Sequence, residues 1–424
     1  MLEKPKLFLN LKQFWFSMLL LLFLLFIRLF FIYSEYKEFK EKPFYFTEVE
    51  VLEAYEKTKA KKKYTVLKLY SSDLNLNFFT TTFIKPQKIH QKLRMKLFPN
   101  YKMKFQEYLG TSFIDSKVNE IFSEERNIKI ELLDFINHQH NNKMIANFYN
   151  AIFFAQPINK KLRNQVSKLG ISHLIALSGF HLAILSSLLF FFLRPIYRFF
   201  QQRYFPYRFD LLDIGFIVLV VLAYYVWFVD APDSLIRSYM MILMGWLFLL
   251  LGVELLTLSF LTTISLILLV IFPNLLVSLA FWLSVIGVFY IFLLLHYFAR
   301  LHKFLIILII SFGLFIFMLP MVHLIFPLTS PLQLLSPFLS LAFNVFYPLS
   351  IGLHVLGLGG LLDNLLLKLF TIQSIQSQLL LSPFLGVGYF LLSLGAFYSK
   401  KLFYILSFLA LAFSLKLFMG FLVL

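Results

Sequence analysis

Long hydrophobic runs occupy most of the chain, and their lengths match those of membrane-spanning helices. The first extends from Phe14 to Tyr33, about 20 residues, which is enough to cross the hydrocarbon core of a bilayer. After Gly170 further runs follow almost without interruption, and they predict spans at His173–Leu193, Leu211–Val229, Ser234–Leu251, Glu254–Phe272, Leu275–Leu295, Phe304–Leu319, Leu379–Tyr398 and Leu402–Leu422. The pattern predicts an all-α polytopic membrane protein with about 10 to 11 spans.

The region from Leu332 to Phe370 is apolar but interrupted. Its stretch SPFLSLAFNVFYPLSIG contains Pro337, Pro348 and Gly352. Irregular backbone at membrane depth persists only where protein or water covers it. We therefore expect a broken element that lines a cavity.

Between Ser34 and Leu169 the pattern changes, and no stretch is apolar enough to span a membrane. FYFTEVEVLEAY and KKKYTVLKLYSSDLNLNFFTTTFI alternate apolar and polar positions around β-branched and aromatic residues, which is typical of strands. The residues that follow have the pattern of amphipathic helices. We expect an anchor helix at 1–33, a small β domain at 34–105, a helical connector at 106–170 and a transmembrane domain at 171–424.

Composition supports the membrane class and excludes some chemistry. Hydrophobic residues make up 59% of the 424 residues and charged residues 14%, with a mean hydropathy of +0.78. A soluble domain does not bury so much apolar surface. The chain has no cysteine, which excludes disulfides, Cys-based zinc sites and thiol catalysis. A formal charge of +17 fits either cytoplasmic loops facing anionic lipid or a polyanionic ligand, and charge alone does not decide between them.

Positive charge predicts the orientation of the spans. Lys4, Lys6 and Lys12 precede the first run, which lacks an A-x-A-like cleavage site, so we expect an uncleaved anchor with a cytoplasmic N-terminus. The β domain is then extracytoplasmic, the loop RPIYRFFQQRYFPYR cytoplasmic and DAPD outside. Two crossings within 332–370, or one re-entrant element plus one span, put Lys400 and Lys401 inside as well; a single span leaves them outside.

The stretch GISHLIALSGFHLAIL places polar residues inside an apolar run. His173, Leu177 and His181 are spaced i, i+4 and i+8 in one predicted span, so both histidines project from the same side of that helix, with Ser178 and Gly179 between them. Ionisable groups at membrane depth are costly and tend to mark a pathway, which favours that interpretation over hydrogen bonding within the bundle. A Ser-His hydrolase lacks support, because no G-x-S-x-G motif surrounds Ser178 and no acid lies nearby.

A second polar group lies in VDAPDSLIRSYMMILMGW. Asp233 fits a helix N-cap, and Ser234 and Arg237 lie one turn apart on the following span. Arg237 either extends to the membrane interface or, being on the expected outer side, meets an acidic partner, a carbonyl cluster or an anionic substrate.

Basic and aromatic residues alternate in EAYEKTKAKKKYTVLKLY. Stacking and phosphate neutralisation there suit single-stranded nucleic acid, whereas a solvated edge strand with protective lysines explains the same pattern. The candidate contacts are Tyr55, Lys59, Lys61, Lys62, Lys63 and Tyr64.

His138 and His140 lack carboxylates at a useful spacing, so we expect solvated histidines and no metal site. The sequence holds no phosphate-binding G-x-x-x-x-G-K-[ST] loop.

KLGISHLIALSGFHLAIL closely resembles the signature of the ComEC-type competence protein family. APDSLIRSYMM, FPNLLVSLAFWLSVIGV and FPLTSPLQLLSPFLSLAFNVFYPLSI resemble later elements of that family in the expected order, covering roughly Asn147 to Ile351. The resemblance implies a cytoplasmic-membrane channel for one strand of transforming DNA. It also implies an OB-like external domain where the β pattern lies.

On this resemblance the polar path would include His173, Ser178, Gly179, His181, Asp233, Ser234, Arg237 and Asn344. Longer members carry a metallo-β-lactamase-like domain with an H-x-H-x-D-H motif that this sequence lacks. We therefore expect no catalytic activity or cofactor here. The expected partners are single-stranded DNA, the lipid bilayer, an external DNA receptor, a separate cytoplasmic ATPase and DNA-processing proteins.

Two other functions stay open. An intramembrane hydrolase or acyltransferase would use His173, Ser178 or His181, but needs a base and an oxyanion site. A small-anion transporter would place Arg237 in its binding site.

Overall fold

The computed structural model describes residues 7–8, 10–59, 62–82, 91–122, 128–252 and 257–421, without the side chains of Glu56, Thr58, Lys59, Lys62, Lys63 and Asp233. The chain divides into two compact units. The smaller comprises Phe8–Ile128 and Thr263–Leu279, and the larger comprises Met1–Leu7, Lys129–Thr262 and Ala280–Leu424.

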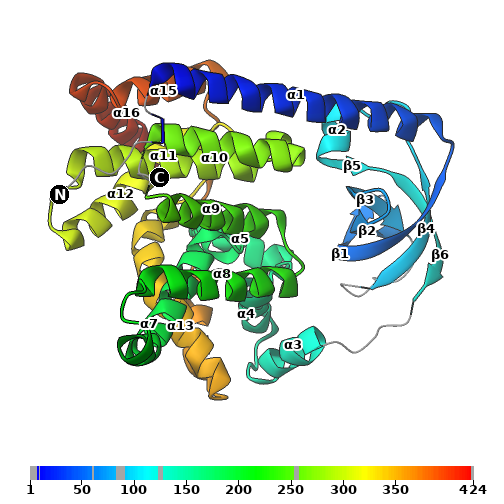
Figure 1. Ribbon diagram of the computed structural model, residues 1–424. Coiled ribbons are helices and arrows are strands. Elements are labelled where there is room, and N and C mark those ends of the chain that lie inside the picture. The colour runs from blue at the N-terminus through cyan, green and yellow to red at the C-terminus, as the bar shows by residue number, and fades with distance from the viewer. Residues whose placement is uncertain are drawn as a thin grey trace. The chain divides into compact units, whose positions relative to one another are not determined.

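The smaller unit contains the β domain (Figure 1). Helix α1 (Leu11–Glu41) precedes six strands and a short helix: β1 (Tyr45–Lys59), β2 (Lys62–Ser71), β3 (Leu76–Thr82), β4 (Lys92–Phe98), α2 (Phe105–Leu109), β5 (Thr111–Phe113) and β6 (Asp115–Ile121). The predicted β domain after the first apolar helix is therefore confirmed. Its sheet also continues past the expected boundary at residue 105, because β5 and β6 lie where a helical connector was predicted.

The strands of this domain pair in a closed circuit. β1 lies between β2 and β4, and β2 pairs with β3, all antiparallel. β5 runs parallel to β3, and β6 runs antiparallel to β4. Ile114 alone separates β5 from β6, and Thr80 Oγ1 of β3 lies 2.7 Å from Ser116 Oγ of β6. The continuous segment β5–β6 thus pairs with β3 at its start and with β4 further along, which leaves few unpaired strand edges.

Alternation along the strands builds the core of the β domain. Successive residues of a strand point to opposite faces, and β3 shows this as a strict alternation of buried and half-buried positions. The fully buried core residues are Val51, Leu67, Leu69, Phe78, Leu93, Met95, Leu97 and Ile114. Helix α1 extends beyond the expected end at Tyr33, and Tyr36 and Phe39 on its last turns join this core. The Tyr36 hydroxyl donates to the Met103 carbonyl at 2.5 Å.

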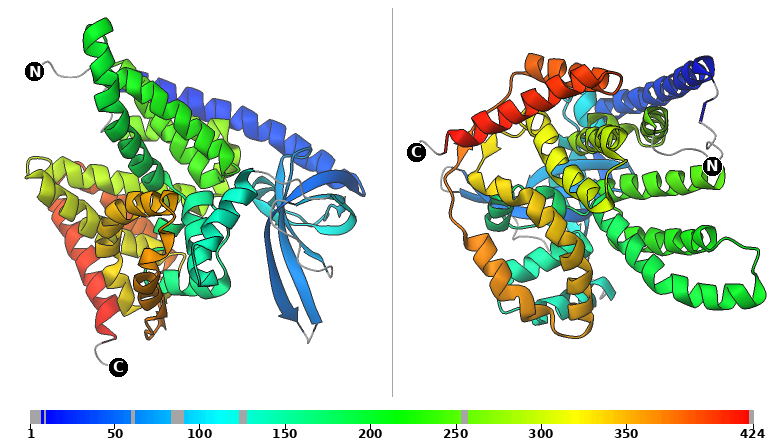
Figure 2. Two further views of the ribbon diagram at one scale, coloured as in Figure 1. Left: turned by 90° about the horizontal axis from the view of Figure 1, so that it is seen from below. Right: turned by 90° about the vertical axis from the view of Figure 1, so that its left-hand side faces the viewer.

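The larger unit is built of helices joined by short connections. Its first half comprises α3 (Ile128–His138), α4 (Lys143–Phe154), α5 (Lys160–Lys168), α6 (Ser172–Ile175), α7 (Gly179–Tyr204), α8 (Asp210–Phe228) and α9 (Asp233–Leu250). Helix α10 (Leu258–Ile271) begins in this unit, and its residues from Thr263 onward belong to the smaller unit. Helices α7 and α8 form an antiparallel hairpin, at the lower right of the right-hand view in Figure 2. The short 3-10 helix η1 (Pro273–Val277) follows α10 and belongs to the smaller unit.

The second half of the larger unit continues with α11 (Leu279–Phe298), α12 (Lys303–Val322), β7 (Leu328–Thr329), η2 (Pro331–Leu335), α13 (Ser336–Val355), η3 (Gly359–Leu362), α14 (Asp363–Thr371), β8 (Ser377–Gln378), α15 (Pro383–Ala396) and α16 (Lys400–Met419). Strands β7 and β8 pair with each other.

The predicted break of the helix within SPFLSLAFNVFYPLSIG is wrong. Pro337 lies in the first helical turn, where a missing N–H costs little, and α13 continues through Pro348. The helix ends instead before Gly357, whose φ of 74° favours glycine.

Seven helices among the described residues are long and apolar enough to cross a membrane. They are Leu11–Glu41, Gly179–Tyr204, Asp210–Phe228, Leu279–Phe298, Lys303–Val322, Pro331–Val355 and Lys400–Met419. Three further predicted spans are shorter apolar helices, at Ser234–Leu250, Leu258–Ile271 and Pro383–Ala396. The class of a mostly helical chain with several membrane-length helices and one small β domain is thus as predicted.

Candidate functional site

The chain breaks between His173 and His181, which corrects the expectation of one continuous helical face. His173 lies in the four-residue helix α6, Ala176 is extended, and α7 begins at Gly179. Ser178 has extended backbone (φ −143°, ψ 178°) and precedes the helix as its N-cap. Serine is favoured there because its short polar side chain can serve the free N–H groups of the first turn. The two histidines therefore belong to different helices.

The first turn of α7 is closed by His181. Its Nδ1 accepts from the backbone N–H of Ser178 at 3.4 Å and lies 3.4 Å from Ser178 Oγ. With Nδ1 accepting, the proton of a neutral ring is on Nε2. That Nε2 is buried without a hydrogen-bond partner among the described residues. The ring is 0% exposed and meets Phe343 and Tyr347 of α13 edge to face.

Helix α9 approaches the same turn closely. A Cβ on Gly179 would lie 3.2 Å from Ser238 Oγ and 3.3 Å from its Cβ, so a small residue is needed there. Ser234 Oγ donates to the Leu177 carbonyl at 2.8 Å, and Ser238 Oγ donates to the Ser234 carbonyl at 2.8 Å. The Ser234 hydroxyl thus joins α9 to the segment before α7, and the small Ser238 lets the two helices approach, as is common where membrane helices pack.

Arg237 lies between these two serines on α9 and is 5% exposed. An arginine that extends to the membrane interface keeps its charged end at the surface, which this burial does not allow. Burial therefore speaks against the first of the two alternatives, an arginine that extends to the membrane interface. Asp233 is the first residue of α9, and Pro232 holds the N-cap position that was predicted for Asp233. The side chain of Asp233, which lies four residues before Arg237, is outside the described part of the chain.

Helix α13 carries the third set of polar groups. Ser336 Oγ donates to the Gly170 carbonyl at 3.0 Å, and Ser340 Oγ lies 3.2 Å from His173 Nε2. Ser336, Ser340 and Asn344 recur every fourth residue and so share one face of α13. The amide of Asn344 donates back to the Ser340 carbonyl at 3.3 Å. His173 and Asn344 are exposed, whereas Ser336 is buried.

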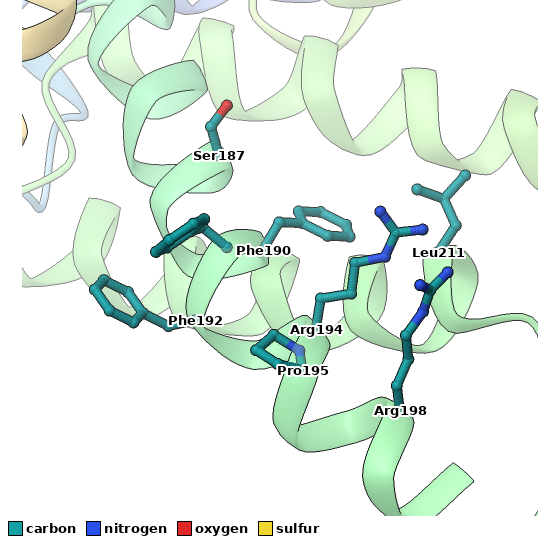
Figure 3. Close-up of a pocket in the computed structure, with 8 residues that line it drawn as sticks. Ser187, Phe190, Phe192, Arg194, Pro195, Arg198 and Leu211 are labelled. Carbon is teal, nitrogen blue, oxygen red and sulfur yellow. The ribbon is translucent and has the colours of Figure 1, made fainter. Parts of the chain in front are cut away.

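These residues form one polar group, which we call the seam: His173, Ser178, Gly179, His181, Ser234, Arg237, Ser238, Ser336, Ser340 and Asn344. It joins the start of α7 to α9 and to α13. Within the seam His181, Arg237, Ser238 and Ser336 are buried. Two hollows near α7 lie elsewhere. One is an open groove of about 600 Å³ at the α7–α8 hairpin, lined by Arg194 and Arg198 among others (Figure 3). The other, of about 430 Å³, is lined by Arg198 and Arg208 among others. Asp210 pairs with Arg194 and Arg198, at 2.9 and 2.7 Å.

The candidate contacts in the β domain lie around the β1–β2 hairpin. Tyr55 is exposed, and Lys57 Nζ lies 5.4 Å from the centre of its ring. The strand register pairs Lys59 with Lys62, Thr58 with Lys63 and Lys57 with Tyr64. The side chains of Lys59, Lys62 and Lys63, and the whole of Lys61, are outside the described residues.

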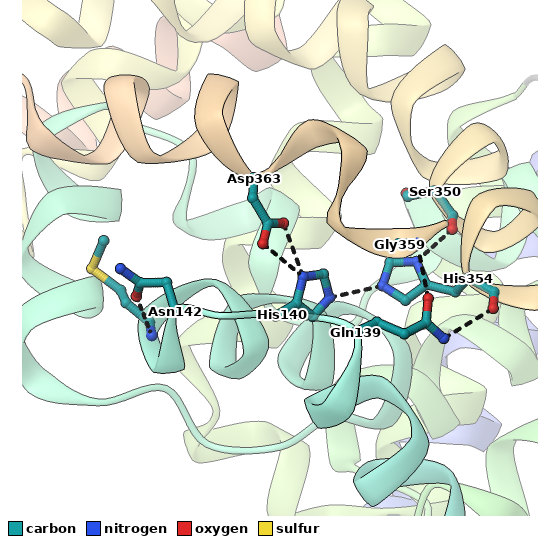
Figure 4. A network of polar contacts seen from close by, with 8 residues as sticks. Gln139, His140, Asn142, Ser350, His354, Gly359 and Asp363 are labelled. Carbon is teal, nitrogen blue, oxygen red and sulfur yellow. Dashed lines mark hydrogen bonds and ion pairs between the residues drawn. The ribbon is translucent and has the colours of Figure 1, made fainter. Parts of the chain in front are cut away.

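The prediction of two solvated histidines in NHQHNN is wrong for one of them. His138 is exposed, but His140 is buried and its Nδ1 lies 2.9 Å from Asp363 Oδ1 (Figure 4). His140 Nε2 lies 3.0 Å from His354 Nε2 at the end of α13. A histidine and an aspartate close together in the apolar segment around GLHVLGLGGLLDNL were the available signal, because ionisable residues in such segments are rarely incidental. No group of three or more His, Asp or Glu able to hold a metal occurs in the described ranges.

A family profile described as competence protein matches residues 155–424, which is more than half of the chain. The chain therefore belongs to the competence protein family. Its family and its membrane-length helices together support a multi-pass membrane protein with a role in competence and DNA uptake. Neither the search of curated proteins nor that of solved structures returned a match. The seam, His354 and Asp363 lie within the matched range, and the β domain and His140 precede it.

Proposed function

We propose that the protein is the channel through which single-stranded DNA crosses the cytoplasmic membrane during competence. Membership of the competence family supports this role. The observation that carries it is the seam: three helices from separate parts of the matched region bring polar groups together within otherwise apolar segments. Polar residues are costly at membrane depth and are typical of a path for a polar solute.

In this proposal the seam is a closed gate. The ring of His181 is packed between the start of α7 and the aromatic pair Phe343 and Tyr347 of α13. Gly179 and Ser238 are in close contact on the other side. Passage of a nucleotide then requires α13 to move away from α7, which would expose the buried His181 to the strand beside Ser340 and Asn344.

The β domain is proposed to receive the strand outside the membrane. Its closed circuit, with β5 parallel to β3 and a bent last strand that also pairs with β4, supports an OB-like barrel. Such domains bind single strands by stacking bases on aromatic residues beside a basic groove. Tyr55 and Lys57, together with the lysines at the tip of the β1–β2 hairpin, supply both chemical types.

The proposed orientation places the N-terminus in the cytoplasm and the β domain outside. The lysines near the N-terminus support it, as do the arginines at the end of α7 and in the loop that follows, Arg194, Arg198, Arg203 and Arg208. An external DNA receptor would deliver the strand, and a separate ATPase and DNA-processing proteins would act on it inside. We propose no enzymatic role. The Ser178–His181 contact resembles a nucleophile and base, but the same Nδ1 also accepts the Ser178 N–H, which supports a role of the pair in helix capping.

The test measures uptake of end-labelled DNA into a nuclease-protected state in a strain whose own copy is deleted. The complementing variants are wild type, Ser340→Val and Asn344→Leu, with Val345→Leu on the exposed face of α13 as the matched control. We expect at least a tenfold loss in the two seam variants and none in the control, at equal membrane abundance. Unchanged uptake in both seam variants would remove the seam from the path. Normal DNA uptake by the deletion strain would favour the hydrolase or the anion transporter.

A further inference from the structure

Asp363, His140 and His354 form a chain of short polar contacts that ends on a backbone carbonyl (Figure 4). Both carboxylate oxygens of Asp363 lie near His140 Nδ1, at 2.9 and 3.1 Å. His140 Nε2 faces His354 Nε2 at 3.0 Å, and His354 Nδ1 lies 2.6 Å from the Ser350 carbonyl. Both rings are buried. The chain connects the loop after α3 to the end of α13 and the start of α14.

Counting donors shows how many protons these contacts require. A carbonyl oxygen only accepts, so His354 Nδ1 must carry a hydrogen. The contact between the two Nε2 atoms needs one hydrogen on either ring, and the contact with Asp363 needs one more. Three contacts therefore require three protons. Two neutral imidazoles and a carboxylate carry only two protons on these nitrogen and oxygen atoms. The three contacts can therefore all form only when the site holds one additional proton.

The surroundings suit a shared positive charge on the two rings. Asp363 supplies the opposite charge, which a buried cation requires. His140 stacks on Tyr149 of α4 with ring centres 4.6 Å apart, and a π face attracts a cation. Tyr149 is the other titratable group that faces the rings in the described structure; burial, and next Asp363, raise its pKa, so it stays neutral. Gln139 is uncharged and bridges the His354 carbonyl to the Gly359 N–H.

We propose that Asp363, His140 and His354 form a proton-binding site that fastens the end of α13 to the loop after α3. With three protons all three contacts form: the two rings share one imidazolium charge, and Asp363 is a carboxylate. Loss of the extra proton leaves two Nε2 lone pairs facing each other, and gain of a fourth leaves two N–H groups facing each other. Either change breaks the contact between His140 and His354 and frees the end of α13.

His323 provides an internal comparison. Like His354, it donates Nδ1–H to the carbonyl four residues earlier, Leu319 at 2.9 Å. Its Nε2 meets the Thr329 hydroxyl at 3.0 Å. A hydroxyl both donates and accepts, so this contact persists with a neutral ring. The difference between the two buried histidines lies in what faces Nε2.

The first experiment records ¹⁵N spectra of the full chain, labelled at histidine and held in lipid nanodiscs. At about pH 8 an exposed histidine is neutral. We expect one imidazolium signal in the wild type, its loss in His354→Gln and Asp363→Asn, and its retention in His323→Gln and His138→Gln. A wild type with no imidazolium, or a signal that survives both site variants, would overturn the proposal. So would an infrared band of a protonated carboxyl that disappears in Asp363→Asn.

The second experiment measures movement and needs no change to the site. The chain has no cysteine, so Asn141→Cys and Leu356→Cys, both at exposed positions, provide a unique pair for spin labels. We expect one narrow distance distribution near pH 7 that broadens when the pH is lowered to about 4.5, roughly two units below the ordinary histidine pKa. A distribution insensitive to pH would overturn the fastening role. The proton-binding site does not depend on DNA passage, and only its effect on the gate rests on the proposed function. If the protein does not take up DNA but the imidazolium signal and the pH-dependent distance are as expected, the channel function is rejected and the proton-binding site is retained.

Discussion

His140 and His354 are 214 residues apart in sequence, and their Nε2 atoms lie 3.0 Å apart in the structure. Two neutral imidazoles with both Nδ1 atoms donating would face each other with lone pairs, so the contact implies a proton held between them. It is made at the end of α13, the helix whose other turns carry Ser336, Ser340 and Asn344 of the seam. The contact and these seam residues thus lie on the same helix, which is the helix that moves in the proposed gate.

Gly359 is expected to be essential for the geometry of this contact. A Cβ there would lie 2.6 Å from Gln139 Oε1 and 2.7 Å from His354 Nε2, which no folded structure tolerates without a shift. Gly359→Ala should destabilise the protein by about 1–3 kcal/mol, as overpacking does. Thermal unfolding of the purified protein measures the change. Gly352→Ala on α13, where a Cβ meets nothing within 4 Å, is the matched control and should be neutral or slightly stabilising. Equal effects of the two changes would contradict the packing at Gly359.

His181→Phe is expected to remove DNA uptake while the protein still folds. Phenylalanine keeps the aromatic packing against Phe343 and Tyr347 but removes Nδ1 and Nε2. The cost is one unmet N–H at Ser178, about 1 kcal/mol. Transformation frequency and membrane abundance are measured together. His296→Phe, whose ring stacks on Phe397 away from the seam, serves as the control. His173→Leu should likewise lose uptake because it removes the contact with Ser340. Normal transformation in both seam variants would leave only a packing role.

DNA uptake is expected to require the guanidinium group of Arg237. Arg237→Lys keeps the charge but loses the planar fork that binds phosphate through two N–H groups, so uptake should fall at least tenfold. Arg237→Ala should lose nearly all uptake. Arg194→Lys, at a half-exposed arginine that pairs with Asp210, is the control and should retain activity. Transformation frequency beside immunoblot abundance measures each variant. Full activity of the lysine variant rules out fork-type binding, and an Asp233→Asn variant that reproduces the arginine phenotype favours an internal ion pair.

The lysines at the tip of the β1–β2 hairpin are expected to contact phosphates. Replacing Lys59, Lys61, Lys62 and Lys63 with glutamine should weaken binding of single-stranded DNA by the full chain. The slope of log affinity against log salt should flatten by about 0.7 for each phosphate that the protein no longer neutralises. Replacing four exposed lysines away from the tip, Lys37, Lys92, Lys102 and Lys117, keeps the same net charge as a control. An identical slope in the wild type and the tip variant assigns these lysines to solubility.

The order of apolar helices and the presence of one β domain were predictable because both depend on local pattern. A run of about 20 apolar residues spans a bilayer whatever its neighbours are, and strict alternation such as that of β3 fits a strand with one buried face. The helix break before Gly179 was not predicted, since apolar periodicity continues through it. The capping by His181 and the close approach of Ser238 decide the break, and both contacts follow only from folding.

Sequence alone therefore determined the class of the protein, its apolar segments and most residues of the seam, because membrane solvation and side-chain polarity act residue by residue. Tertiary structure alone decided which polar groups meet. The sheet closes because β5 and β6 pair with different strands, and the partners of His140 are supplied by α13 and α14 more than two hundred residues later. The local sequence does not distinguish the buried His140 from the solvated His138. The difference between them is the set of donors and acceptors that distant segments bring to the ring.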